Sequence, residues 1–498
     1  MKKNIIIFLL LLLFYFLALQ YFNVIFLAGD DGYMMRIANG SFFGVNDYHL
    51  VFINSILGKF FVFLYSHLPY YEWYFVIFIF LQFISSFIII CELSKRMEFF
   101  KLFIFLLPLF YYLCFLNFTT LTFLLTFSGF LLLDSYINNK KNIFLIGSAL
   151  SLFIGLLYRL EMVLLCAALF FIYLLLKEHR KSYKILLVYF LFFCATTISL
   201  NTYNKKTYAE SKDWQFYFDY NKERGSINDN FGVGYLLGEL KEENDPLEND
   251  LKLAARNFIF TDQMSLEKLK EINHNLTSDK SISYYNILKN IRFTSFFLLI
   301  LICFFSVILF IIYKKQKTIA VVVVLMLMMF YLTLHHTLKD RIIFPMIFLT
   351  IYFILDTVKF KISKKNKIQS SIIFVLLAIM VEAYWFYPEK KKQFEKLDLS
   401  SKTIMLDGSN YFAQTSFIKM NETTNIIPGG WFTNFPLVKE KTKNNYLGSH
   451  LSLIDDKYLN ENFMYFIFDK NTHKLIDTHL KKSNRKLITV KNNLYKIQ

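Results

Sequence analysis

The sequence predicts an all-α polytopic membrane protein of about eleven transmembrane helices, followed by a small extracytoplasmic α/β domain. Three observations support this prediction. The 498 residues are 55% hydrophobic and 19% aromatic, and their mean hydropathy is +0.39, a composition that a soluble protein of this size has difficulty burying. Apolar stretches recur along residues 1–387, most of them long enough to cross a hydrocarbon core about 30 Å thick. Residues 388–498 are polar.

Eleven apolar segments are expected to cross the membrane. They lie at 5–27, 71–92, 101–116, 118–136, 142–157, 162–176, 183–201, 292–313, 318–334, 342–358 and 369–387. The first resembles a signal peptide, but its apolar run is too long, and no convincing small-x-small cleavage site precedes the acidic pair that follows. We therefore expect it to be an uncleaved anchor. All five cysteines lie in or beside these segments, which argues against disulfides in the exported regions and against a thiolate metal site.

The net charge of +17 is explained by membrane topology and requires no nucleic-acid partner. Six basic clusters fall on one side of the predicted membrane, at positions 2–3, 95–101, 140–141, 177–184, 314–317 and 359–367, and they hold 19 Lys and Arg residues. The short loops on the other side hold five, namely Arg36, Lys59, Arg159, Lys339 and Arg341. Since cytoplasmic loops carry the excess of basic residues, we expect a cytoplasmic N-terminus in a bacterial inner membrane and an exported C-terminus. Anionic lipid head groups of the bilayer account for the charge.

Two further segments are assigned to the outer side. Residues 49–68 are apolar, but counting them as a span would invert the charge pattern downstream, so we expect an amphipathic helix lying on the outer membrane surface. Residues 202–290 form a long polar loop on the same side. The chain thus divides into a transmembrane module at 1–387 and an exported α/β domain at 388–498. In that domain KTIMLDGS, MYFIFDK and KLITVKNNLYKI are expected to form strands.

Three polar clusters fall on this outer side. They are Asp30 and Asp31 with Arg36 and His49, then Arg159 and Glu161 in a short turn, and finally Lys339 and Arg341 in LHHTLKDRIIFP. Ionisable residues at membrane depth are costly and tend to mark function. We therefore expect one cavity lined by carboxylates and guanidinium groups.

This order of residues resembles the GT-C superfamily of integral membrane glycosyltransferases, which use sugars linked to a polyprenyl phosphate. The resemblance rests on the acidic pair after the first span, the run NDYHLVFINSILGKFFVFLYSHLPYYEWY, the Arg-x-Glu turn and KDRIIFPMIF. It covers residues 1–165 and 335–350, whereas the long loop 202–290 departs from the commoner pattern. It implies transfer of a sugar from the lipid-linked donor to a glycan, lipid or protein acceptor on the outer face, by inversion at the anomeric carbon.

The resemblance also implies roles for the residues. Asp30 or Asp31 would be the catalytic base, with Asp30 preferred as the first acid of the pair. Arg341 and Lys339 would hold the donor phosphate, because a guanidinium forms charged, bidentate bonds with phosphate oxygens. Arg159 and Glu161 would contact the sugar or acceptor, or pair with each other. His49 and Arg36 are further candidates for substrate contact.

Electrostatics adds one requirement. Two adjacent carboxylates repel each other, so one of their pKa values rises unless a cation lies nearby. Arg36 or a divalent metal ion at Asp30 and Asp31 would meet that need. No third oxygen ligand is evident in the sequence, so we assign no metal ligands and expect no other cofactor.

Three alternatives remain open at this point. An O-antigen polymerase or ligase would also handle lipid-linked sugars, but its key Arg and His residues would lie in the large loop, which offers only Arg224, Arg256 and His274. A lipid-linked glycan flippase or other transporter would carry charges within its spans and show internal repeats. A non-catalytic assembly protein would tolerate loss of the acidic pair.

Overall fold

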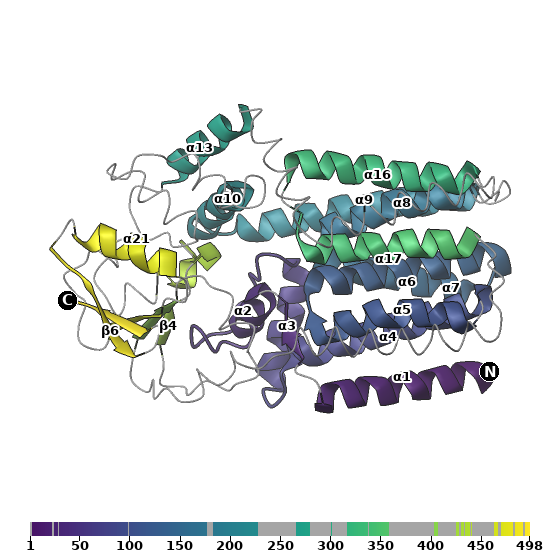
Figure 1. Cartoon of the computed structure of the whole chain (residues 1–498), viewed down its shortest axis with the longest axis horizontal. Helices are drawn as coiled ribbons and strands as arrows, with labels where there is room; N and C mark the ends of the chain where they lie inside the picture. Colours follow the sequence, from purple (N-terminus) through teal and green to yellow (C-terminus); the bar gives the residue numbers. More distant parts are fainter. Residues whose placement is uncertain are drawn as a thin grey trace.

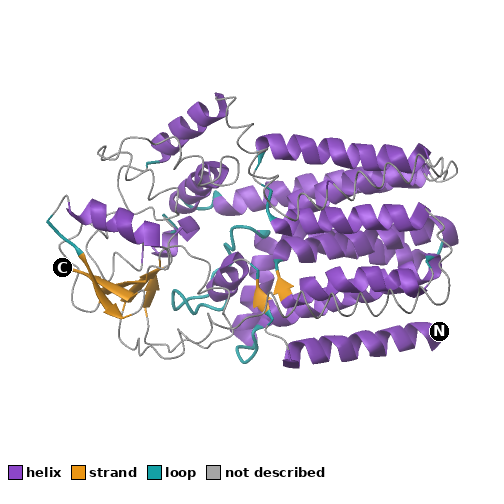
Figure 2. Cartoon of the chain, in the orientation of Figure 1, coloured by secondary structure: helices purple, strands orange, loops and turns teal. Residues whose placement is uncertain are grey.

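The computed structural model describes residues 2–21, 24–27, 29–97, 99–176, 183–227, 265–278, 300, 316–336, 338–357, 403–406, 425–427, 430–432, 434–438, 440, 463–466, 470–481, 484–491 and 494–498. Within these ranges the chain is mostly helical, with a few short strands (Figure 2). The predicted spans at 292–313 and 369–387 fall, apart from residue 300, outside the described residues.

Helices occupy the other nine predicted positions. They are α1 (Lys2–Tyr21), α4 (Trp73–Arg96), α5 (Phe99–Cys114), α6 (Phe118–Asn139), α7 (Asn142–Tyr158), α8 (Leu160–Leu176), α9 (Tyr183–Tyr208), α16 (Gln316–His335) and α17 (Asp340–Thr357). Among the described residues, four helices are long and apolar enough to cross a membrane: Lys3–Tyr21, Trp73–Arg96, Phe118–Asn139 and Tyr183–Tyr208. Shorter apolar helices lie at Asn142–Tyr158, Leu160–Leu175 and Val322–His335. These helices indicate a membrane protein.

The long helices lie side by side in a bundle with α6 at its centre (Figure 1). Nearly all of α6 is buried, whereas α1 and α9 expose leucine and phenylalanine side chains on the outside of the bundle. Small residues allow α6 and α7 to approach closely, because a Cβ atom on Gly129 would lie 3.0 Å from the Leu152 side chain. The hydroxyls of Thr122 and Thr126 donate to carbonyls one turn back. These two hydroxyls of the apolar central helix therefore find their acceptors within the helix itself.

Short helices gather at the end of the bundle opposite the N-terminus (Figure 1). They are α2 (Gly29–Ala38), α3 (Ser55–His67) and α10 (Lys212–Ser226), with α13 (Leu266–Ser278) beyond them. The helix expected at 49–68 begins only at Ser55, because Asn54 caps it by accepting the amide N–H of Ile56. One face of α3 is buried, while Phe60 and Phe63 on the other face are exposed.

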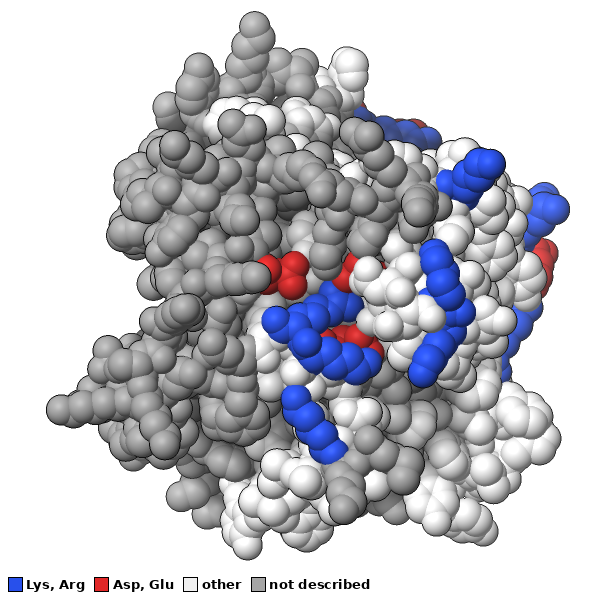
Figure 3. All heavy atoms as spheres, turned by 90° about the vertical axis from the view of Figure 1, so that its right-hand side faces the viewer, with Lys and Arg blue, Asp and Glu red and all other residues white. Residues whose placement is uncertain are grey.

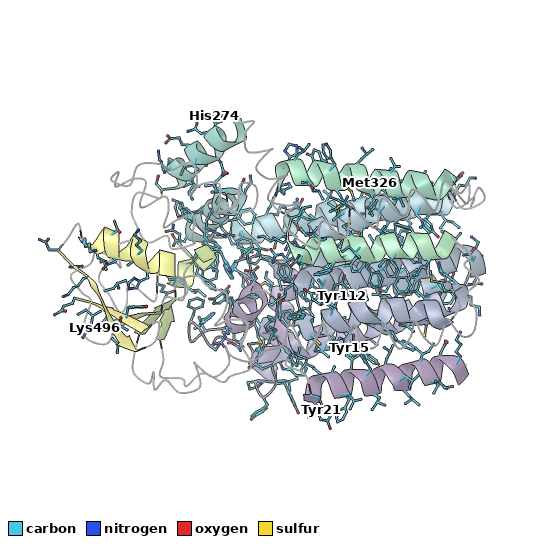
Figure 4. The ribbon with its side chains drawn as sticks, in the orientation of Figure 1. Tyr15, Tyr21, Tyr112, His274, Met326 and Lys496 are labelled. Atoms are coloured by element: carbon cyan, nitrogen blue, oxygen red, sulfur yellow. The ribbon has the colours of Figure 1, made fainter. Side chains whose placement is uncertain are left out.

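A five-stranded sheet lies beyond these helices, with strand order β4-β3-β5-β7-β6. It comprises β3 (Thr403–Leu406), β4 (Asn425–Ile427), β5 (Phe463–Phe466), β6 (Leu487–Lys491) and β7 (Leu494–Ile497), and α21 (Lys470–Lys481) accompanies it. The first three strands of that order are parallel, and β7 is antiparallel to both β5 and β6. Lys496 lies on this sheet, whereas Tyr15 and Tyr112 lie within the bundle (Figure 4).

Two very short strands escaped the sequence prediction. β1 (Ile25–Phe26) follows α1 and pairs in parallel with β2 (Phe115–Leu116), which precedes α6. The amide of Leu27 extends this pairing by donating to the Leu116 carbonyl at 2.8 Å. This pairing brings the start of α2 to the start of α6.

The other end of the bundle carries a cluster of charged residues, visible where that end faces the viewer in Figure 3. Arg96 at the end of α4 forms an ion pair with Asp134 of α6 and donates to the Ser135 hydroxyl at 3.1 Å. Ser135 in turn donates to Glu92. Lys3 donates to the Ser94 carbonyl at 2.9 Å, which joins the start of α1 to the end of α4. Several of the predicted cytoplasmic basic clusters therefore share one end of the bundle.

Candidate functional site

The acidic pair lies in the first turn of α2, although the sequence suggested a loop. Asp30 and Asp31 follow Gly29 at the helix start, where carboxylates are favoured by the free amides and the helix dipole. The rest of the helix is buried, and its apolar side chains such as Met34 and Ile37 pack in the core. The acids are thus held on a buried element.

Asp31 is fully buried and acts as a junction between three helices. Its Oδ1 accepts the Tyr74 hydroxyl of α4 at 2.8 Å, and its Oδ2 accepts the Asn117 amide at 3.3 Å. The backbone N–H of Phe118 donates to both oxygens, at 3.2 and 3.3 Å. Asn117 cannot reverse its amide without losing its cap on α6, because its Oδ1 accepts the Thr119 N–H at 2.9 Å. Asp31 therefore connects α2 to α4 and to the start of α6.

Burial gives Asp31 a pH-dependent contribution to stability. Burial raises the pKa of this carboxyl from 3.8 to about 8. The hydrogen bond from Tyr74 lowers the pKa, repulsion from Asp30 raises it, and the Phe118 N–H and Arg341 lower it by smaller amounts. The folded chain keeps the proton that the unfolded chain releases. The stabilising contribution is therefore fully present below the unfolded pKa and is lost as the pH rises through the folded pKa.

We expect the free energy of unfolding to fall by about 1.4 kcal/mol per pH unit between about pH 5 and about pH 7 through this group, and less steeply as the pH approaches 8. Asp31→Asn should remove that slope, because an asparagine amide replaces the protonated acid while Tyr74 turns to accept from it. Thermal unfolding of the purified protein in detergent across this range measures the difference between the two proteins. Parallel pH profiles for wild type and variant would contradict the assignment.

Asp30 has a different environment. Its Oδ2 lies 3.2 Å from an Nη atom of Arg341 in the first turn of α17, although 311 residues separate them in sequence. The Asp30 side chain is 17% exposed and that of Arg341 is 12% exposed, so both reach the protein surface while Asp31 does not. Of the two acids, Asp30 is the one that an incoming hydroxyl group can approach.

A second arginine adjoins this pair through a shared aromatic ring. The guanidinium carbons of Arg341 and Arg159 lie 5.9 and 5.0 Å from the centre of the Phe118 ring, within the range of cation–π contacts. Arg159 also donates to the Thr119 hydroxyl at 3.1 Å and lies 3.6 Å from Glu161. Glu161 is 78% exposed at the side chain, so water screens this second ion pair. Two guanidinium groups beside one carboxylate can bind a phosphate.

Arg36 and His49 lie away from this pair. Arg36 is six residues beyond Asp30, about 9 Å along the helix axis, and its guanidinium lies 5.6 Å from the Phe42 ring. Burial lowers the pKa of Arg36 to about 10. The cation beside Asp30 is thus Arg341, whereas the sequence suggested Arg36 or a divalent metal ion for that place.

His49 belongs to a separate aromatic group at the start of α10. Its Nδ1 lies 2.9 Å from the Asp47 carboxylate, and its ring stacks on Trp214 with centroids 3.7 Å apart. The Tyr208 ring contacts it edge-on. The structure gives His49 neighbours other than the acidic pair.

Lys339 lies immediately before α17, where its carbonyl accepts the amides of Ile342 and Ile343. It is half-buried and two residues from Arg341, so it starts the helix that positions the arginine.

The contacts of the two acids do not suit a divalent metal ion. The Asp31 oxygens already accept from three donors, and Asp30 pairs with a guanidinium. In the part of the chain that the structure describes, no three His, Cys, Asp or Glu side chains gather as a metal site. Hydrogen-bond donors and cations therefore surround these carboxylates where a metal would need free oxygen lone pairs.

Sequence reasoning missed the neutral residues of the site, namely Tyr74, Asn117, Phe118 and Thr119. Asn117 carried a usable signal, since an Asn directly before an apolar helix is a common N-cap. Tyr74 and Phe118 carried none, because aromatic residues are abundant throughout the chain. Comparisons of the chain with protein-family models, with curated proteins and with solved structures found no match.

Proposed function

We propose that the protein is a membrane glycosyltransferase of GT-C type. It moves a sugar from a polyprenyl-phosphate donor to a glycan, lipid or protein acceptor on the outer face of a bacterial cytoplasmic membrane. About eleven spans hold the N-terminus in the cytoplasm, and residues 388–498 form an exported α/β domain. The observation that carries this proposal is the ion pair between Asp30 and Arg341 beside a second arginine.

The chemistry needs a base at one end and positive charge at the other. The acceptor oxygen forms a bond to the anomeric carbon while the bond from that carbon to the phosphate oxygen breaks. Asp30 takes the hydroxyl proton, and the leaving phosphate keeps the electron pair. Arg341 and Arg159 stabilise the charge that develops on that phosphate.

The ion pair has a role before the reaction starts. The guanidinium of Arg341 lies against the Asp30 Oδ2, an oxygen that could otherwise accept the hydroxyl proton. A bound phosphate competes for Arg341 and draws it away from Asp30. Donor binding would in this way release the base only when the sugar is present.

The arrangement of charges supports the outer face as the location. The ends of α1 and α4 that carry Lys3, Lys95 and Arg96 lie together at one end of the bundle. Asp30, Arg159 and Arg341 lie at the other. By the excess of basic residues on cytoplasmic sides, the second end faces outward.

Asp30→Asn tests the proposal. We expect surface-glycan product to fall by roughly 10²-fold, the lower range for loss of a general base, at normal protein abundance in the membrane. Asp213→Asn is the matched control, since Asp213 is an exposed acid in the first turn of α10 at the same end of the protein. A host strain lacking the chromosomal copy, complemented with each variant, gives glycan composition and protein level together. Unchanged glycan with Asp30→Asn at normal abundance would refute the function.

A further inference from the structure

A C-terminal segment packs directly onto the helices that hold the acidic pair. Residues 430–432 and 434–438 place Phe432, Phe435 and Val438 in the main hydrophobic core. The Tyr217 hydroxyl of α10 donates to the Trp431 carbonyl at 3.0 Å. The segment is therefore fixed to the membrane module.

Trp431 reaches the aromatic residues that lead to the candidate site. Its ring contacts Tyr33 and Phe52 edge-on, with centroids 6.0 and 5.2 Å apart. Tyr33 lies three residues after Asp30 on α2, so the two side chains share a helix face. Phe52 stacks on Phe118 at 6.0 Å.

These contacts close into a ring of residues. Arg341 contacts the Phe118 ring and forms the ion pair with Asp30. Asp30 lies on α2, as does Tyr33, so the series of contacts is closed. The ring joins one carboxylate and one guanidinium to three aromatic side chains and an indole. Aromatic walls with a few convergent polar groups are typical of small-ligand sites.

The indole N–H of Trp431 has no hydrogen-bond partner in the part of the chain that the structure describes. The residue is 7% exposed, and its Nε1 is buried without a hydrogen-bond acceptor among the described residues. Buried tryptophan N–H groups are usually hydrogen-bonded. An oxygen atom that enters with a ligand would complete this donor.

We propose that Trp431 binds the sugar of the lipid-linked donor, with its indole N–H donating to a sugar hydroxyl. The inference rests on the proposed function, in which Arg341, connected to Trp431 through Phe52 and Phe118, holds the phosphate to which that sugar is attached. A sugar ring has apolar C–H faces that pack on aromatic rings such as Phe52 and hydroxyls that accept from N–H groups. The C-terminal segment would thus complete the catalytic site and contribute to sugar specificity.

The test compares Trp431→Phe with Trp431→His in the complemented strain. Both variants lose the indole, but only histidine keeps a ring N–H. We expect Trp431→Phe to lower glycan product per molecule of membrane protein at least 10-fold and Trp431→His to retain several-fold more product than Phe. Trp214→Phe is the matched control, because it makes the same chemical change in the aromatic group around His49 and should leave product unchanged.

Two readouts separate a sugar contact from a packing role. Product is normalised to protein abundance, and the unfolding temperature of each purified variant is measured in detergent. Wild-type product per molecule from Trp431→Phe would overturn the inference, as would equal losses in the Phe and His variants that follow their unfolding temperatures. If Asp30→Asn abolishes product while Trp431→Phe does not, the inference about Trp431 is wrong but the proposed function stands. If neither changes product, the proposed function fails as well.

Discussion

Replacing Arg341 with methionine is expected to lower glycan transfer by about 10³-fold, which is the upper range for loss of one hydrogen-bond donor that stabilises charge in a transition state. Under the proposed function the variant removes the group that would stabilise the leaving phosphate, and it leaves Asp30 without its partner at 3.2 Å. Arg159 remains beside Phe118, so some phosphate binding persists. Glycan product per molecule of membrane protein is the measurement.

Arg341→Lys separates charge from geometry. Lysine keeps the positive charge but cannot form the paired bonds of a planar guanidinium, so we expect it to recover only a small part of the lost activity. Lys141→Gln, which removes an exposed basic residue before α7 at the other end of the bundle, is the control and should have no effect. Full activity in the methionine variant would exclude Arg341 from phosphate binding.

Replacing Arg96 with methionine is expected to lower the free energy of unfolding by about 3–5 kcal/mol, the cost of breaking a buried ion pair from one side. Arg96 is the cation between Glu92 and Asp134, and both carboxylates are almost fully buried. Without it they repel each other at the ends of α4 and α6. Unfolding by denaturant in mixed micelles measures the loss.

The neighbouring residue supplies the control for that measurement. Lys95 also pairs with Glu92, but its side chain is 45% exposed, so Lys95→Met should cost less than about 1 kcal/mol. Glycan product per folded molecule should be near normal in both variants, because this cluster lies at the end of the bundle away from Asp30. Equal stability losses for the two variants would show that burial does not determine the contribution of Arg96.

Much of the helical framework could be predicted from the sequence. Nine of the described helices lie at predicted spans, because long apolar runs can be recognised from the sequence alone. The charge bias placed Asp30 and Arg341 on the same side, and the structure brings them into contact. Both inferences use properties of short continuous stretches of sequence, namely apolar length and the number of basic residues.

The sequence could not predict features that depend on the direction of a side chain or on contacts between residues far apart in the chain. Arg36 is close to Asp30 in sequence, yet the helical turn carries it to another face and into contact with Phe42. Buried Asp31 is hydrogen-bonded by Tyr74 and Asn117. Nothing in the sequence distinguishes these two residues from the other tyrosines and asparagines of the chain. Trp431 lies in a polar region of the chain, so nothing local indicated that it packs against α2.

The ion pair between α2 and α17 also has a consequence for biosynthesis. Asp30 emerges from the ribosome 311 residues before Arg341, so a growing chain carries the carboxylate without its cation for most of translation. Only after α17 has been synthesised can the nascent protein form the ion pair between Asp30 and Arg341. A polypeptide that ends before that helix therefore keeps the Asp30 carboxylate without its partner, and under the proposed function we expect it to be inactive.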